Sequence, residues 1–278
     1  MAITVHTYKL LKHYSEKIFN FGNVLSLGRL DILISKDEYK KFNIPFSKNA
    51  YVNNDFFFDF KFNSFKSLDA SEFEGSEIIH DLNKPIEKDI GKYDTIIDFG
   101  TSEHVFDIVQ NLKNINYLCK NGGHIIHCLP ANNNCGHGFW QFSPELFFQL
   151  YNEKNCFYET ELILINMLEK NKFYKVENYT YLERLDFNSD VPLYLFVKTK
   201  KRNNQNFGPI FQSDYEKQWK NITSEESKKS NLSKLFKNLK NNFKKIPFLD
   251  KFFTYRSDIK FYKKKNYLRS KFIKRVNI

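Results

Sequence analysis

The sequence predicts an α/β fold with a mostly parallel sheet of about seven strands, followed by a basic helical extension. The main observation is a pair of short apolar runs, Tyr93–Phe99 and His124–Leu129, that flank a segment with helical spacing at about 105–118. The helix is expected to stop at Asn121-Gly122-Gly123. A strand, a crossover helix and a second strand, with strands apolar on both faces, are typical of a parallel βαβ unit.

The remaining elements follow from short apolar runs and capping residues. Further strands are expected at 23–27, 64–69, 77–80, 161–167 and 191–197, and further helices at 7–20, 36–42 and 144–152. Ser143 and Pro144 predict the start of the last helix, because serine is a favoured N-cap and proline suits the first helical position. No element is assigned to the Asn- and Phe-rich segment 43–62.

Charge divides the chain into two parts. From Lys200 onward there are 22 Lys and Arg against 6 Asp and Glu, whereas residues 1–199 have 21 against 26. We therefore expect a domain over 1–202 and a basic, helical extension over 203–278, with an apolar stripe between Leu232 and Ile246. Packing of this extension on the domain or on a second copy is favoured. The alternatives are an anionic membrane surface, a polyanionic glycan and nucleic acid.

Location is inferred from the absence of several signals. No apolar run approaches the roughly 20 residues of a membrane span, and the N-terminus lacks the apolar stretch of a signal peptide. The four cysteines show no disulfide spacing. We expect a cytoplasmic protein, with peripheral contact at the inner face of the membrane as the alternative.

Ligands of parallel sheets bind beyond the carboxyl ends of the strands. In this sequence those ends are 98–104 and 130–133, and further acidic residues, Asp69 and Asp81, follow the strands at 64–69 and 77–80. The functional residues are therefore expected at one edge of the sheet.

The segments that carry these residues read SLDASEFEGSEIIHDLNKPI, IIDFGTSEHVF, KNGGHIIHCLPANN and HGFWQFSPELF. Together with the strand plan they resemble the class I S-adenosylmethionine-dependent methyltransferases. More narrowly, they resemble a bacterial family of methyltransferase-like proteins associated with surface-polysaccharide biosynthesis. The resemblance covers roughly residues 23–199. It implies a Rossmann-like sheet, S-adenosyl-L-methionine as cofactor, and O-methylation of a small polar or glycan-linked acceptor.

The resemblance also implies a set of cofactor-binding residues at the strand ends. They are Gly28, Arg29, Asp69, Ala70, Asp81, Leu82, Asp98, Gly100 and Thr101. Asp69 would accept hydrogen bonds from the ribose hydroxyls, and Asp81 would lie beside the adenine. The sequence departs from the usual pattern in having one glycine, Gly28, instead of a glycine-rich loop, and Asp69 follows 41 residues later rather than about 20. Each strand-end aspartate could instead cap a turn.

The candidate catalytic residues are Glu103, His104 and His137. His104 is expected in the first turn of the helix that faces the acceptor, where an imidazole with an ordinary pKa of about 6.5 can accept a hydroxyl proton. Thr101 or Ser102 would cap that helix and Glu103 would complement its positive end, which is a purely structural alternative.

The loop 130–142 supplies the candidate acceptor-binding residues, namely Asn132, Asn133, Phe139 and Trp140. Amides beside aromatic side chains suit a polar, sugar-like or phosphate-bearing acceptor. The amides could equally satisfy the backbone of the loop itself.

A metal site is the rival interpretation of this region. Three histidines and two cysteines lie within 14 residues: His124, His127, Cys128, Cys135 and His137. Their spacing is not that of zinc ligands, and strand alternation places His124 and His127 on opposite faces. The sequence therefore predicts no metal site.

Two other functions remain open. One is a catalytically silent binding protein that kept the fold, which the single Gly28 favours. The other is an RNA methyltransferase gripping its substrate through the basic extension, although the acidic body argues against nucleic acid as a partner. Expected partners are thus a small or glycan-linked acceptor, an anionic membrane surface and a second copy of the chain.

Overall fold

The computed structural model describes residues 2–17, 20–45, 50–54, 60–178, 189–213 and 272–278. The chain divides into two units: 1–177 with 190–210 and 274–278, and 178–189 with 211–273. Nearly all of the second unit, including the helix predicted between Leu232 and Ile246, lies outside the described residues. The account below therefore concerns the first unit.

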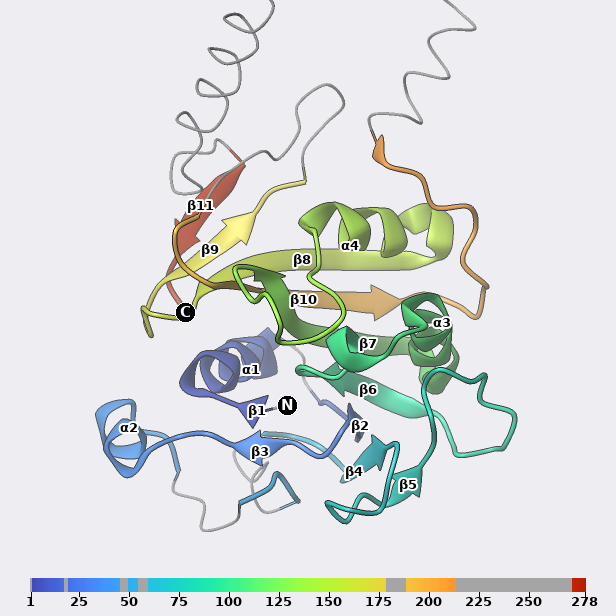
Figure 1. The fold of residues 1–278 in the computed structure, drawn as a ribbon, viewed down its shortest axis with the longest axis horizontal. Helices are drawn as coiled ribbons and strands as arrows, with labels where there is room; N and C mark the ends of the chain where they lie inside the picture. The colour runs from blue at the N-terminus through green and yellow to red at the C-terminus, as the bar shows by residue number, and fades with distance from the viewer. Residues whose placement is uncertain (1, 18–19, 46–49, 55–59, 179–188, 214–271) are drawn as a thin grey trace, which may run out of the picture. The chain divides into compact units, whose positions relative to one another are not determined.

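The first unit is built on a nine-stranded sheet with the order β11-β9-β8-β10-β7-β6-β2-β4-β5 (Figure 1). The strands are β2 Asn23–Leu27, β4 Ser64–Asp69, β5 Ile78–Ile79, β6 Tyr93–Asp98, β7 Cys119–Asn132, β8 Phe157–Asn166, β9 Phe173–Val176, β10 Leu193–Lys201 and β11 Ile273–Val276. A separate parallel pair joins β1 (Ala2–Ile3) to β3 (Asp31–Ile32).

Strand directions divide the sheet into two halves. The strands β5, β4, β2, β6 and β7 pair in parallel. Beyond β7, β10 is antiparallel to both β7 and β8, and β9 is antiparallel to β8. The predicted sheet of about seven mostly parallel strands is therefore corrected to nine strands of mixed direction. The short strands β9 and β11 carry little periodicity of their own and depend on their partners.

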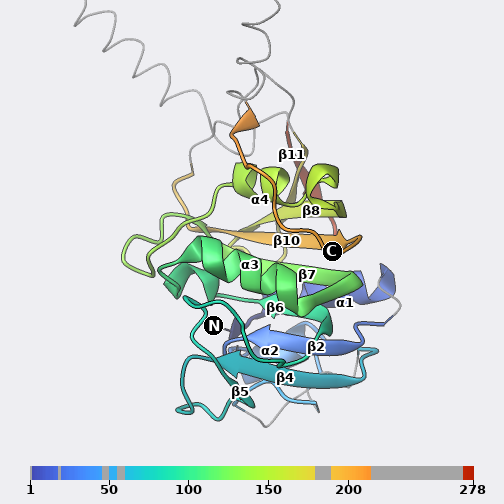
Figure 2. The same ribbon diagram turned by 90° about the vertical axis from the view of Figure 1, so that its right-hand side faces the viewer.

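Helices cover both faces of the sheet (Figure 2). Helix α1 (Val5–Lys17) lies on one face, where the Tyr14 ring stacks on Phe196 of β10 with centroids 5.7 Å apart. Helices α3 (Ile108–Leu118) and α4 (Pro144–Leu150) lie on the other face, where Phe147 and Tyr151 contact His127 of β7. A short helix, α2 (Lys36–Lys41), follows β3.

The central βαβ unit is confirmed, but its helix begins later than predicted. Residues Ser102–His104 form a 3₁₀ turn, and α3 starts after Asp107, whose carboxylate accepts a hydrogen bond from Gln110 N. Thr101 makes no capping bond, because its hydroxyl donates to Leu27 O at 2.5 Å. By contrast, the predicted start of α4 is confirmed, since the Ser143 side chain accepts from Glu145 N and Pro144 opens the helix.

The C-terminal residues return to the sheet. Lys274–Ile278 belong to the first unit, although the sequence assigned them to the extension. Val276 and Ile278 pack against the apolar cluster under α1. The boundary predicted at 202/203 therefore does not separate the last five residues from the domain.

The four cysteines are free thiols. Within the part of the chain that the structure describes, no helix has both the length and the apolar character needed to cross a membrane.

Candidate functional site

The polar strand ends meet at one edge of the sheet, as predicted. Leu27, the last residue of β2, lies opposite Leu68 of β4 on one side and Asp98 of β6 on the other. Asp98 in turn lies opposite His127 of β7. The residues that follow these strands therefore share one edge.

Asp69 is held at this edge by backbone donors. Its Oδ2 accepts a hydrogen bond from Arg29 N at 3.2 Å and its Oδ1 accepts one from Ala70 N at 2.6 Å. Gly28 adopts a left-handed conformation with φ 74°, and its N–H donates to Leu68 O at 2.6 Å. Asp69 is partly exposed. Each carboxylate oxygen can accept a further hydrogen bond, so Asp69 can receive hydroxyl donors.

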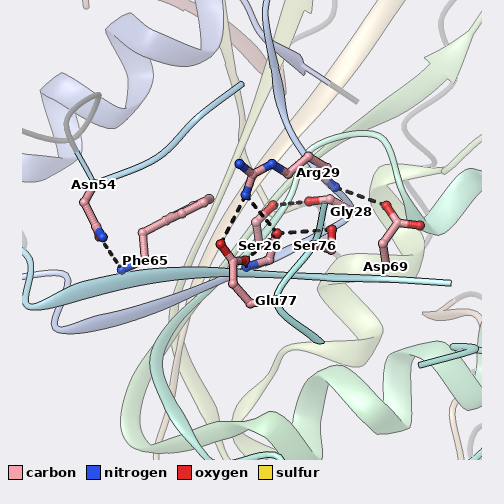
Figure 3. A network of polar contacts seen from close by, with 9 residues as sticks. Ser26, Gly28, Arg29, Asn54, Phe65, Asp69, Ser76 and Glu77 are labelled. Carbon is pink, nitrogen blue, oxygen red and sulfur yellow. Dashed lines mark hydrogen bonds and ion pairs between the residues drawn. The ribbon is translucent and has the colours of Figure 1, made fainter. Parts of the chain in front are cut away.

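The side chain of Arg29 points away from Asp69 and into a polar network (Figure 3). Its Nη1 donates to Ser67 Oγ and to Glu77 Oε1, both at 3.3 Å. Burial opposes ionisation of Glu77, but hydrogen bonds from Ser67 and the nearby guanidinium outweigh it and lower the Glu77 pKa. Arg29 thus ties β2 to β4 and to the segment before β5. Glu77 was not identified from the sequence, because nothing local marks its partners.

Asp81 and Leu82 lie in a turn after β5. Asp81 Oδ1 accepts from Asn83 N at 3.0 Å and Asn83 Nδ2 at 2.8 Å, and these bonds lower the Asp81 pKa. Leu82 is buried, and its carbonyl accepts from Asn114 Nδ2 of α3 at 3.1 Å. Asp81 therefore caps this turn, which is the structural alternative stated for the strand-end aspartates. Its side chain is still partly exposed to solvent.

Asp98 is fully buried, and its carboxylate is occupied by protein donors. Oδ1 accepts from Thr101 N at 3.2 Å and Ser102 N at 3.1 Å, and Oδ2 accepts from Ser102 Oγ at 2.5 Å. His127 Nδ1 lies 2.7 Å from Oδ2, and His127 Nε2 lies 2.7 Å from Tyr151 Oη. Burial raises the Asp98 pKa, but His127 and Ser102 outweigh burial and lower it.

This buried network organises the turn from Asp98 to Glu103. Gly100 enters the turn with φ 91°, a left-handed conformation that suits glycine. Three residues that were predicted to contact the cofactor therefore shape the backbone of this turn, namely Asp98, Gly100 and Thr101. His127 was not identified as a member, because its partners Asp98 and Tyr151 are 29 and 24 residues away.

The three predicted catalytic residues lie together. One potential ligand atom from each of Glu103, His104 and His137 lies within 4.8 Å of those of the other two. His137 Nε2 is 3.6 Å from Glu103 Oε1, and the His104 and His137 ring centroids are 5.3 Å apart. Burial, followed by the neighbouring His137, lowers the His104 pKa below its ordinary 6.5.

Glu103 is the buried member of this cluster. Its side chain is 0% exposed, and among the described residues neither carboxylate oxygen has a hydrogen-bond partner. Burial, followed by the nearby Asp98, raises the Glu103 pKa to about 8. The two imidazoles are more exposed, so the cluster opens toward solvent on the histidine side.

The loop after β7 is locked onto Glu103. Glu103 O accepts hydrogen bonds from Phe139 N at 2.7 Å and Trp140 N at 3.3 Å. A Cβ at Gly138 would lie 2.8 Å from Glu103 O, so only glycine fits there. These contacts place His137 beside Glu103 although the two residues are 34 positions apart in the sequence.

The predicted acceptor-binding residues divide into two kinds. Asn132 Oδ1 accepts from Leu193 N and Asn133 Nδ2 donates to Val191 O, so these amides bind backbone groups at and just before the start of β10. Phe139 and Trp140 present aromatic surface, being 66% and 38% exposed. Phe106, which the sequence did not suggest, packs edge-on against Phe139 with centroids 5.8 Å apart and is 72% exposed.

Two hollows of the described surface lie elsewhere. One, of about 630 Å³, is lined by residues of α1, the segment after α2 and the C-terminus, and another, of about 700 Å³, lies beside α3 and Lys201. Neither is lined by the strand-end residues described above, so we place the candidate site by its side-chain chemistry.

Neither the protein-family models nor the curated proteins contain a match to the sequence. Among solved structures, the chain is similar to an S-adenosylmethionine-dependent methyltransferase from Clostridium acetobutylicum, with 13% identity, a TM-score of 0.29, and 73% of this chain and 75% of that chain covered. It is also similar to the N-methyltransferase NodS from Bradyrhizobium japonicum, with 10% identity, a TM-score of 0.35, and 71% and 95% covered. A third is a methyltransferase from Thermotoga maritima described as a possible histamine N-methyltransferase, with 13% identity, a TM-score of 0.36, and 72% and 91% covered. These likenesses are too weak to support an inference about this chain.

Proposed function

We propose that this protein is an S-adenosyl-L-methionine-dependent methyltransferase. The observation that carries the proposal is the sheet itself. Its order β5-β4-β2-β6-β7 is the 3-2-1-4-5 order of a doubly wound sheet, and β8 stands in the sixth position. One antiparallel strand, β10, is inserted between the fifth and sixth positions. A Rossmann-like sheet is what the resemblance of the sequence segments to the class I methyltransferases implies.

The residues at the carboxyl edge of the sheet have hydrogen-bond acceptors and accessible backbone that suit the cofactor. Asp69 has acceptor capacity left for two ribose hydroxyls, and the left-handed Gly28 beside it lets the backbone approach a ligand without a Cβ. Asp81 and Leu82 would lie on the adenine side. When bound, the cofactor supplies an electrophilic methyl group on a sulfonium.

The acceptor would lie over Glu103, His104 and His137. The imidazoles can hold a proton released by a hydroxyl or an amine, and the aromatic surface of Phe139 and Trp140 can orient the acceptor and exclude water. Methyl transfer is an in-line displacement, so orientation of the acceptor contributes most of what the protein must do.

The acceptor that we propose is a small polar or glycan-linked molecule, methylated on oxygen, in surface-polysaccharide biosynthesis. Support comes from the sequence resemblance and from the aromatic surface beside polar groups, a combination that suits a sugar. A catalytically silent binding protein is the second candidate. The specific observation in its favour is the single Gly28 at a position where a glycine-rich loop is usual.

Calorimetric titration with S-adenosyl-L-methionine and with its demethylated product, S-adenosylhomocysteine, tests the proposal. We expect saturable binding of both compounds in the micromolar range at one site per chain. Folded wild-type protein that gives no heat and no thermal shift with either compound would overturn the cofactor assignment. Binding without methyl transfer to any sugar-containing acceptor would favour the silent protein.

A further inference from the structure

We propose that Glu103, His104 and His137 form a site for one divalent transition-metal ion, with Zn²⁺ as the representative. The sequence did not indicate this site. There, His137 was a candidate metal ligand only together with the histidines and cysteines of β7 and the loop that follows it. The proposal stands on the geometry of the three side chains and does not require the proposed function. If both hold, the ion would bind an oxygen of the acceptor, and the two imidazoles would be its ligands instead of holding the acceptor's proton.

The three side chains are already close to the spacing of metal ligands. Their ligand atoms lie within 4.8 Å of one another. Two ligand atoms about 2.0–2.2 Å from a tetrahedral zinc ion lie roughly 3.3–3.6 Å apart. Rotations of the exposed His104 and His137 side chains would close this difference of about an ångström, while the buried Glu103 stays in place.

Glu103 provides a second, independent observation. Its side chain is 0% exposed, and neither carboxylate oxygen has a hydrogen-bond partner among the described residues. A buried carboxylate without partners is costly, and such groups in proteins are normally paired or bound to a metal. The nearest described cationic candidate is His137, at 3.6 Å, which is beyond hydrogen-bond length. A bound cation would satisfy both oxygens.

The backbone holds the ligands in position before any ion arrives. Phe139 N and Trp140 N both donate to Glu103 O, and Gly138 fits closely against the same residue. His104 follows Glu103 in a 3₁₀ turn that the Asp98 network stabilises. The loop that carries His137 is therefore anchored on the residue that would share the ion with it.

The ligand set indicates the kind of ion. Two imidazoles and one carboxylate suit zinc and its neighbours, whereas Mg²⁺ prefers oxygen ligands alone. Three protein ligands leave at least one coordination position open, as in catalytic rather than structural zinc sites. The exposed histidine side of the cluster leaves that position open toward solvent.

Cobalt provides a direct test, because Co²⁺ occupies zinc sites and absorbs visible light when bound. The full chain, free of any polyhistidine tag, is titrated with Co²⁺, and Zn²⁺ is then added to displace it. We expect one equivalent of Co²⁺ with visible bands from nitrogen and oxygen ligands, and loss of these bands on addition of Zn²⁺. Glu103→Gln and His137→Ala should each weaken binding by at least tenfold.

Matched controls separate this site from adventitious binding. Cys135→Ser changes an exposed thiol two residues from His137, and His80→Gln removes a histidine elsewhere. Both should bind Co²⁺ as the wild type does. Because Gln has nearly the shape of Glu and carries no charge, Glu103→Gln should stay folded, and Zn²⁺ should raise the melting temperature of the wild type but not of this variant.

Three results would overturn the proposal: no Co²⁺ binding by the wild type, undiminished binding by Glu103→Gln, or loss of binding in Cys135→Ser. The S-adenosylhomocysteine titration separates this question from the proposed function. Metal binding without cofactor binding would refute the methyltransferase and leave the metal site standing. Cofactor binding without metal binding would refute the metal site and leave the methyltransferase proposal standing.

Discussion

His127 Nδ1 lies 2.7 Å from Asp98 Oδ2 in the interior of the protein, where both side chains are 0% exposed. The pair joins the last residue of β6 to the adjacent parallel strand β7, and the same Asp98 oxygen accepts from Ser102 Oγ. It therefore connects the core of the sheet to the turn that presents Glu103 and His104.

Removal of one partner of this pair should be strongly destabilising. His127→Leu leaves Asp98 without its neighbour in a buried site, and we expect a loss of about 3–5 kcal/mol in the free energy of unfolding. Tyr151→Phe, which removes only the hydroxyl 2.7 Å from His127 Nε2, should cost about 1–3 kcal/mol. Urea denaturation of both variants checks that His127→Leu lowers the free energy of unfolding more than Tyr151→Phe does. Equal losses of this free energy in the two variants would show that His127 does not stabilise the buried Asp98.

Cofactor affinity should depend on Asp69. Asp69→Ala removes the acceptors proposed for the ribose, each worth about 1.5–3 kcal/mol when charged. S-adenosylhomocysteine should therefore bind at least tenfold more weakly by calorimetry. Glu72→Ala, an exposed change in the following loop, is the matched control and should bind normally. Unchanged affinity in Asp69→Ala would place the ribose elsewhere.

Turnover should depend on the two clustered histidines. With an acceptor in hand, His104→Ala or His137→Ala should lower the rate by about 10²–10⁴ if the imidazole takes part in activating the acceptor. Cofactor affinity should change little, because Asp69 and Gly28 are untouched. Near-normal rates in both variants would show that neither imidazole activates the acceptor. This region would then contribute to catalysis only by orienting the acceptor.

Acid sensitivity should be reduced by replacing His124. Burial, followed by Lys198 and Lys200, lowers the His124 pKa to about 4, whereas an unfolded histidine has a pKa of about 6.5. The unfolded chain thus binds this proton more readily, so stability is lost as pH falls from about 6.5 to 4. His124→Gln should lose less stability over that range in melts at stepped pH. A loss equal to that of the wild type would exclude His124 as a contributor.

The C-terminal strand should contribute to stability. Deletion of Lys274–Ile278 removes three residues of β11 and the contacts of Val276 and Ile278 with the apolar cluster under α1, which we expect to cost about 1–2 kcal/mol. Lys274→Ala with Arg275→Ala changes only exposed side chains of the same strand and should stay within about 0.5 kcal/mol. Thermal melts of the two variants check this. A melting temperature lowered by the deletion but not by the double substitution would show that β11 stabilises the domain, and an unchanged melting temperature in both would show that it does not.

Local pattern was sufficient for much of the fold. The bounds of β2 and β4 coincide with the predicted strands, and the Ser143 cap of α4 lies where the sequence placed it. Such features depend on side-chain alternation and on bonds between residues a few positions apart. The same reasoning placed Glu103 and His104 at the carboxyl edge, because a strand and its following turn are contiguous in sequence.

Tertiary structure decided the rest. The antiparallel insertion of β10 and the return of β11 depend on pairing between segments far apart in the chain, for which no local signal exists. The same holds for the site: His127 and Glu77 have partners that only the fold brings near, and the contact of Gly138 with Glu103 places His137. The sequence by itself determined which polar groups reach the sheet edge. Only the packed loops decided which of them face one another, because burial and hydrogen bonding act between neighbours in space.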